Sequence, residues 1–137
     1  MLTFFKLFLV ASASFLALDF LWLNVFAKKF YFQNMQEVAH IQDGQIQINL
    51  VPGLLVYVLL ALGIVHFILP LLNSEQNYFS VFLAGSYFGL IVYGVYDLTN
   101  AATLKSWPLA LIVVDTLWGA FATGLATVIT TFAKKLL

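Results

Sequence analysis

Two short motifs carry the side chains most capable of chemistry in this sequence. Asp19 precedes Trp22 by three residues, and Asp115 precedes Trp118 by the same spacing. Residues three apart lie on one face of a helix, so each motif places an acid and an indole on the same helix face. Both motifs lie in stretches apolar enough to cross a bilayer, where a carboxylate costs a few kcal/mol and persists only with a partner or a task. The motifs predict an internal polar site that binds protons or a small ligand.

Composition predicts a membrane protein. Hydrophobic residues make up 63% of the 137 residues and charged residues only 9%, against roughly a quarter charged in a typical soluble domain. The length is that of one domain, and we expect residues 1–137 to form a single integral membrane domain. The six basic residues are all lysines and balance six acids, which leaves no basic patch for nucleic acid. With no cysteine and two scattered histidines, His40 and His66, we expect no metal site and no cofactor.

Four apolar segments lie close to the roughly 20 residues that a helix needs to span a bilayer. They cover about residues 4–26, 50–72, 78–96 and 108–132. The predicted fold is therefore all-α: a polytopic membrane protein with four transmembrane helices in one bundle and both termini on one face. Pro108 suits the start of the fourth helix. Thr and Asn favour local side-chain bonds over helix interiors, so we expect the backbone to leave regular helix at Asp97–Asn100.

Chain direction brings the polar residues to one depth. We call the face of the termini side A and the opposite face side B. Asp19 and Asp115 each lie seven residues from a helix end on side B, about 10 Å inside the membrane at 1.5 Å per residue. Helical spacing aligns polar stripes on three helices, which we expect to share a pocket open toward side B. The candidate binding or proton site consists of Asp19, Trp22, Tyr93, Tyr96, Asp97, Asn100, Asp115 and Trp118.

Two interpretations of the acids remain open. They could staple the bundle by accepting hydrogen bonds from Trp and Tyr across helices. Alternatively, three acids in one half of the membrane, with only Lys105 nearby as a cation, favour a site that takes up and releases protons. Elsewhere, Gly85 and Gly89 have the spacing of a close helix-packing face. Three further aromatics are expected in the interfacial belt: Trp107, Tyr31 and Tyr78.

A longer motif follows the third apolar segment. It comprises Tyr96-Asp97-Leu98-Thr99-Asn100, Ala102-Thr103-Leu104-Lys105, Trp107-Pro108, Asp115 and Trp118-Gly119. This motif, with Leu18-Asp19 and Leu21-Trp22-Leu23 upstream, resembles the signature of an uncharacterised bacterial four-helix inner-membrane family, domain of unknown function 2177. The resemblance covers nearly the whole chain and implies a multi-pass protein of the bacterial inner (cytoplasmic) membrane. It implies no established activity, although members are sometimes encoded near fatty-acid-modifying enzymes.

Two function classes therefore stay open, besides a purely structural subunit. The first is a small proton-linked transporter, or a membrane protein that binds a small molecule or lipid. The alternative is a membrane-embedded enzyme or accessory subunit acting on a lipid or fatty-acyl substrate, with Asp115 or Asp97 as general acid or base. The lipid bilayer is the expected partner in either case.

Lysine placement does not fix the orientation in the membrane. Side A carries Lys6, Lys134 and Lys135, and side B carries Lys28, Lys29 and Lys105. The side richer in Lys and Arg normally stays in the cytoplasm, and here the two counts are equal. The lysine pair at the end of the last helix favours cytoplasmic termini. The equal counts also permit insertion in both orientations and an antiparallel homodimer.

Overall fold

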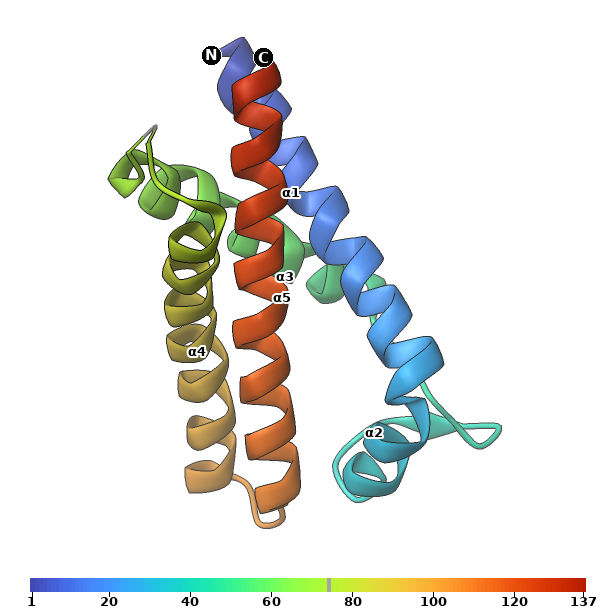
Figure 1. The fold of residues 1–137 in the computed structure, drawn as a ribbon. Coiled ribbons are helices and arrows are strands. Elements are labelled where there is room, and N and C mark those ends of the chain that lie inside the picture. Colours follow the sequence, from blue (N-terminus) through green and yellow to red (C-terminus); the bar gives the residue numbers. More distant parts are fainter. Residues whose placement is uncertain (74) are drawn as a thin grey trace.

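The computed structural model describes residues 1–73 and 75–137, and the chain is almost entirely helical (Figure 1). Within these described residues the chain forms five α-helices: α1 (Leu2–Leu21), α2 (Lys28–Met35), α3 (Leu50–Gly63), α4 (Tyr78–Thr103) and α5 (Leu109–Leu136). A π-helical turn, Trp22–Phe26, extends α1, and the turns Ile64–Ile68 and Leu69–Leu71 extend α3. In the described part of the chain, four continuous helical stretches are long and apolar enough to cross a membrane: Leu2–Phe26, Leu50–Leu71, Tyr78–Thr103 and Leu109–Leu136. The predicted all-α, four-span membrane fold is confirmed.

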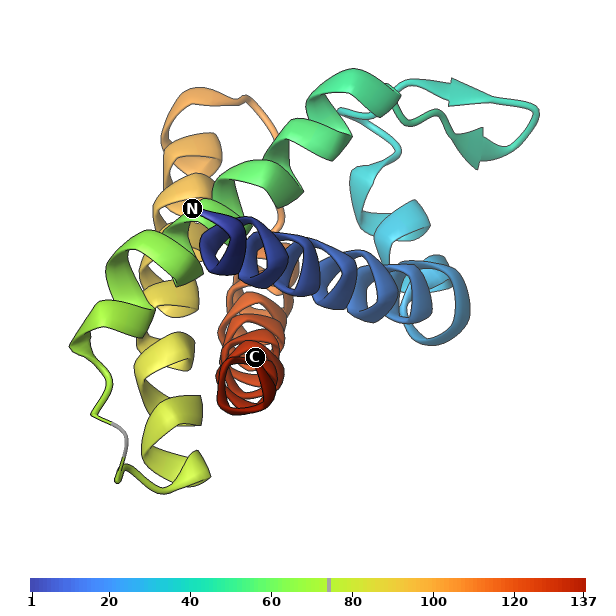
Figure 2. The ribbon, with the colours of Figure 1, turned by 90° about the horizontal axis from the view of Figure 1, so that it is seen from above.

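Helices α4 and α5 form an antiparallel pair that lies side by side in both views (Figures 1 and 2). Small residues allow this close approach. A Cβ at Gly85 would overlap Thr127, and a Cβ at Gly89 would overlap Thr123 and the carbonyl oxygen of Gly119. The predicted packing face at Gly85 and Gly89 is therefore confirmed, and it holds the two helices in a fixed register.

Helix α1 meets α5 near the chain termini and leans away from it toward α2 (Figure 1). Its inner face is a stripe with four-residue spacing: Leu7, Ala11, Phe15 and Asp19 are all buried. Seen from above, α5 is nearly end-on whereas α3 is seen along its length, so α3 crosses the bundle at a steep inclination (Figure 2). Both chain ends lie at one end of the molecule, side A, with α2 and the α4–α5 connection toward the opposite end, side B (Figure 1).

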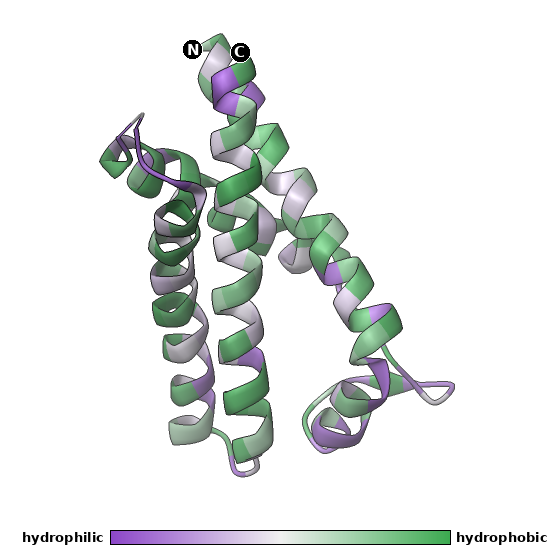
Figure 3. Ribbon diagram, in the orientation of Figure 1, coloured by the Kyte–Doolittle hydropathy of each residue, from purple (hydrophilic) through white to green (hydrophobic). Residues whose placement is uncertain are grey.

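The polar segment after α1 forms α2 and a small hairpin of β1 (Ile41–Gln42) and β2 (Gln45–Ile46). Asp43 and Gly44 form its turn with φ values of 52° and 70°, in the left-handed region that Gly and Asp tolerate best. Colouring by hydropathy sets this segment apart from the apolar spans (Figure 3). Large apolar side chains such as Phe20, Leu59 and Leu117 are exposed on the spans, as contact with lipid requires.

The observed end of α4 corrects one expectation. The helix does not end at Tyr96 but continues regularly through Asp97–Asn100 to Thr103, so the expected irregular backbone there is wrong. The polar side chains are satisfied without breaking the helix. The Thr103 hydroxyl donates to the Thr99 carbonyl oxygen at 2.8 Å, one turn back, and the Asp97 carboxyl bonds to other residues instead of to its own backbone. At the next helix Pro108 is the N-cap, and α5 runs to Leu136, beyond the expected residue 132.

Candidate functional site

Asp19 is held between three spanning helices. The buried stripe of α1 points its carboxyl inward, where 9% of the residue is exposed. The Trp118 indole Nε1 of α5 donates to Asp19 Oδ1 at 2.7 Å. The Tyr57 hydroxyl of α3 lies within hydrogen-bonding reach of the same carboxyl. Asp19 therefore has neutral donors from two other helices around it, and Trp118 forms the hydrogen bond.

Asp115 accepts a hydrogen bond from the short helix α2. The Tyr31 hydroxyl donates to Asp115 Oδ1 and accepts a hydrogen bond from Trp22 Nε1 at 3.3 Å. The expectation that Tyr31 belongs to the interfacial belt is wrong, because only 8% of the residue is exposed. Burial, followed by the nearby charge of Asp115, raises the pKa of Tyr31 above its ordinary value, so the phenol stays a neutral donor.

The two motifs are paired crosswise. The Trp22 and Trp118 rings stack with centroids 4.4 Å apart and planes 5° apart. Each indole is linked to the acid of the other motif: Trp118 donates a hydrogen bond to Asp19 directly, and Trp22 donates one to Tyr31, which in turn donates to Asp115. We call this arrangement the crossed brace; its members are Asp19, Trp118, Trp22, Tyr31 and Asp115. It joins the arm formed by α1 and α2 to α5.

Local backbone geometry positions the crossed brace. The π-helical turn begins at Trp22 and ends where the Ala27 N–H donates to the Trp22 carbonyl oxygen at 2.7 Å. This turn ends α1 and starts α2 at Lys28. Ala27 and Tyr31, four residues apart, then bury one face of the short helix against Leu111 of α5. π-helical turns are rare and are frequently found at functional sites.

Tyr93 of α4 completes the centre. Its ring lies against Gly119, so closely that a Cβ at that glycine would overlap the ring. This contact explains why a glycine follows Trp118 in the sequence motif. The Tyr93 hydroxyl lies close enough to both Asp19 and Asp115 to interact electrostatically with the ionised form of either acid. All four spanning helices and α2 thus contribute a side chain to one acidic and aromatic centre.

Asp97 belongs to a separate cluster. It is fully buried and accepts hydrogen bonds from Trp107 Nε1 at 3.1 Å and from the Thr116 hydroxyl at 3.4 Å. The sequence suggested only an interfacial-belt role for Trp107, but its indole N–H is a hydrogen-bond donor to a buried acid. Tyr96 is 54% exposed and meets Trp107 edge-on, and the Asn100 side-chain nitrogen is buried without a hydrogen-bond partner among the described residues.

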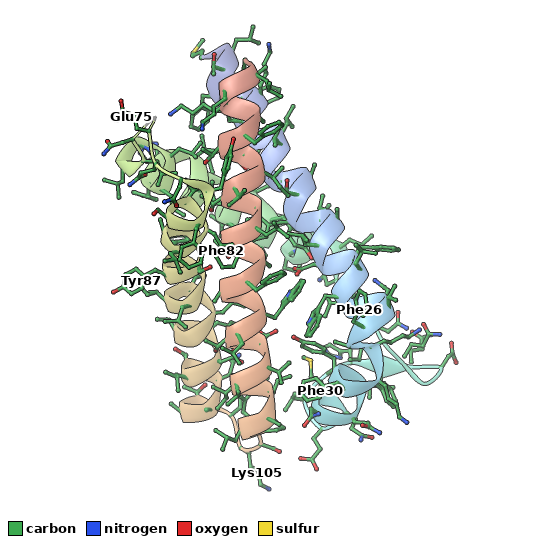
Figure 4. All side chains as sticks on the ribbon, viewed as in Figure 1. Phe26, Phe30, Glu75, Phe82, Tyr87 and Lys105 are labelled. Atoms are coloured by element: carbon green, nitrogen blue, oxygen red, sulfur yellow. The ribbon has the colours of Figure 1, made fainter. Side chains whose placement is uncertain are left out.

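The structure thus brings together five of the eight predicted site residues and leaves three apart. Asp19, Trp22, Tyr93, Asp115 and Trp118 share the centre, whereas Tyr96, Asp97 and Asn100 do not. Sequence reasoning missed both Tyr31 and Tyr57 as site residues. A faint signal was available: Ala27 and Tyr31 have the spacing of a helix face. Lys105, the cation expected nearby, points away from the bundle (Figure 4).

Two of the pockets lined by described residues lie away from the acidic centre, and no member of the crossed brace lines either of them. One is an open apolar groove of about 410 Å³, which runs along α1 from Val10 to Leu21 and is bordered by Ile129 of α5. The other, of about 380 Å³, lies on side A between the end of the α3 span and the end of α5. Across residues 1–73 and 75–137, no three His, Asp or Glu side chains gather closely enough to hold a metal ion.

Comparison with known proteins identifies the family. No curated protein and no solved structure matches the chain significantly. The resemblance noted in the motifs around Asp97, Asp115 and Trp118 is confirmed along nearly the whole chain, because the family's sequence model matches residues 4–132. The chain belongs to the DUF2177 family, described as predicted membrane protein.

Proposed function

We propose that this integral membrane protein is a small proton-linked transporter of the bacterial inner membrane. In this proposal the crossed brace is its gate, and Asp19 and Asp115 carry the protons. One observation supports it above the others. Two hydrogen bonds of the brace link α5 to the α1–α2 arm, and a carboxyl accepts each of them: Asp115 accepts one and Asp19 the other.

Proton release provides a mechanism for the gate. An ionised carboxyl is costly to bury in an apolar bundle, and neutral donors such as Trp118 and Tyr31 offset only part of that cost. The closed brace therefore favours protonated Asp19 and Asp115, and loss of the protons would favour a conformation in which water reaches both carboxylates. A change of about 2 kcal/mol alters the ratio of two conformations roughly thirtyfold. The α1–α2 arm would then separate from α5 and open the centre toward side B.

The chemistry of the centre favours a small organic cation as cargo. Opening the brace would expose two carboxyls and the faces of Trp22 and Trp118. Indole faces attract cations electrostatically, and carboxylates do so more strongly. A cation and a proton would then compete for the same acids, which is the requirement for exchange of one against the other across the membrane.

Asn variants of the acids test this proposal. In proteoliposomes with an imposed pH gradient, wild-type protein should release protons when ethidium is added, as detected by a pH-sensitive dye. Asp19→Asn and Asp115→Asn should abolish this exchange while keeping the fold, because the amide is nearly isosteric and still accepts hydrogen bonds. Asp97→Asn is the matched control, since Asp97 lies outside the brace, and it should retain exchange.

Two results would contradict the proposal. No exchange by wild-type protein would remove the transport function. Equal exchange by wild type and both brace variants would show that the acids only staple the bundle. Turnover of an added phospholipid that depends on Asp115, without any cation exchange, would instead support the enzyme hypothesis.

A further inference from the structure

A pocket with a partly polar lining lies on side A, away from the crossed brace. Its apolar wall is Leu69 and Leu72, where the α3 span ends. Asn73 and Gln76 border it from the connection to α4. The last turns of α5 supply Thr131, Lys134 and Lys135. The cavity volume of about 380 Å³ is within the roughly 300–1,000 Å³ of small-ligand sites.

Several groups around this pocket can donate a hydrogen bond to an anion. The Thr131 hydroxyl oxygen is buried and has no hydrogen-bond partner in the described part of the chain. The Gln76 side-chain oxygen already accepts from the Asn73 backbone N–H at 3.1 Å, which leaves its amide nitrogen as the available group. The Lys135 ammonium lies 4.7 Å above the centre of the Tyr78 ring, so a cation–π contact holds it beside the pocket.

Charge and depth both point to a lipid. The acid of this connection, Glu75, points away from the bundle (Figure 4). The pocket lies where the spans Leu50–Leu71 and Leu109–Leu136 end and Tyr78 begins the next, which is the depth of the headgroups. Lysines at this depth attract anionic headgroups. Leu69 and Leu72 offer an apolar surface to the chain below the headgroup.

We propose that this pocket binds the phosphate of an anionic glycerophospholipid, with Lys134, Lys135 and Thr131 as its ligands. The site is independent of the proton chemistry at Asp19 and Asp115. It assigns a role to the C-terminal lysine pair beyond orientation, namely to fix one lipid against the junction of α3 and α5.

Native mass spectrometry of the purified full-length protein tests this site. The protein is equilibrated with equal amounts of phosphatidylglycerol and phosphatidylcholine, and the retained lipids are counted. Wild-type protein should retain phosphatidylglycerol preferentially. Lys134→Gln with Lys135→Gln should lower this preference by at least roughly tenfold. Thr131→Val, which replaces the hydroxyl by a methyl group of similar size, should lower it less.

The matched control removes the same charge from another site. Lys28→Gln with Lys29→Gln, at the start of α2, should leave the preference unchanged. An equal loss of the phosphatidylglycerol preference in this control would overturn the proposed lipid site, because general charge attraction would then explain the binding. Equal retention of the two lipids by wild-type protein would also overturn it. Displacement of the bound lipid by millimolar inorganic phosphate alone would assign the pocket to a free anion and overturn the lipid proposal.

Discussion

At the scale of single residues, the structure shows how a carboxyl can be placed inside an apolar bundle without a cation. Asp19, Asp97 and Asp115 each receive at least one hydrogen bond from an indole N–H or a phenol. These donors are neutral, and their rings are themselves apolar, so they satisfy the acid without introducing a second charge. Residues of this kind keep such a site compatible with both the charged and the neutral acid.

Replacing Tyr31 by Phe tests the brace at one hydroxyl. The change removes the donor to Asp115 and the acceptor for Trp22 together, and leaves both groups buried without that partner. We expect a loss of about 1–3 kcal/mol in the free energy of unfolding. Thermal melting in detergent measures it. Tyr87→Phe is the control, because Tyr87 is 69% exposed on the lipid-facing surface and should melt like wild type. Equal melting temperatures for both variants would show that the hydrogen bonds of the Tyr31 hydroxyl do not stabilise the fold.

The dependence of melting on pH tests the acids themselves. If Asp19 and Asp115 titrate, the melting temperature of wild-type protein should change between pH 5 and 8, because proton uptake alters the brace. A protein carrying both Asp19→Asn and Asp115→Asn should lose this dependence, whereas Asp97→Asn should keep it. The same pH profile in all three proteins would show that the brace acids do not titrate in this range.

Residue patterns predicted the centre better than they predicted its partners. The matching depth of Asp19 and Asp115 follows from helix length and direction alone, and the structure places both acids in one centre. The crossed pairing does not follow, because it depends on the α1–α2 arm folding back so that Tyr31 reaches Asp115. Asp97 shares the depth but faces Trp107 and Thr116, and residue spacing within one helix does not specify which neighbour that helix faces.

At the scale of elements, the four spans were predictable because each is a long apolar run, whereas their ends and inclinations were not. Helix α4 passes through Asp97–Asn100 because tertiary partners and the bond from Thr103 to Thr99 satisfy its polar groups. The steep crossing of α3 depends on side-chain packing around Ile64 and Leu60, which hydropathy does not encode. Tertiary contacts thus override the local preferences of Thr and Asn.

The α4–α5 contact can be tested by adding one methyl group. In Gly89→Ala the new Cβ would overlap the backbone carbonyl oxygen of Gly119, which cannot rotate away. We expect a loss of roughly 1–3 kcal/mol in stability, as for other overpacked interfaces. Gly94→Ala on the same helix is the control. Its Cβ would meet only Thr116 at 3.8 Å, and alanine favours the helix by about 1 kcal/mol, so this variant should be neutral or stabilised.

Unfolding in mixed micelles at increasing SDS fraction compares the two glycine variants. A Gly89→Ala protein as stable as Gly94→Ala would mean that α4 and α5 are not packed through these glycines. Because Gly119 also receives the Tyr93 ring, separation of the two helices should disturb the acidic centre as well. We therefore expect Gly89→Ala to reduce cation exchange in proteoliposomes, and Gly94→Ala to leave it unchanged.

At the scale of the whole molecule, both chain ends lie on side A (Figure 1). By their positions in the sequence, the six lysines divide three to three between the two sides. The molecule therefore has nearly balanced orientation signals, and small changes in lysine count should redirect it. Lys28→Gln with Lys29→Gln leaves three lysines on side A against Lys105 alone, which should fix the termini in the cytoplasm. Lys134→Gln with Lys135→Gln leaves Lys6 against three and should turn the termini outward.

Fusions of green fluorescent protein and of alkaline phosphatase to the C-terminus report these orientations, since the first fluoresces only in the cytoplasm and the second is active only outside it. We expect cytoplasmic fluorescence from wild-type protein, stronger bias in the same direction when Lys28 and Lys29 are replaced, and phosphatase activity when Lys134 and Lys135 are replaced. Signal from both fusions of the wild type would mean that the chain inserts in both orientations, as an antiparallel homodimer requires. Unchanged orientation in both double variants would mean that the lysine count does not set the topology, and that the fold of the α1–α2 arm on side B holds that face in place during insertion.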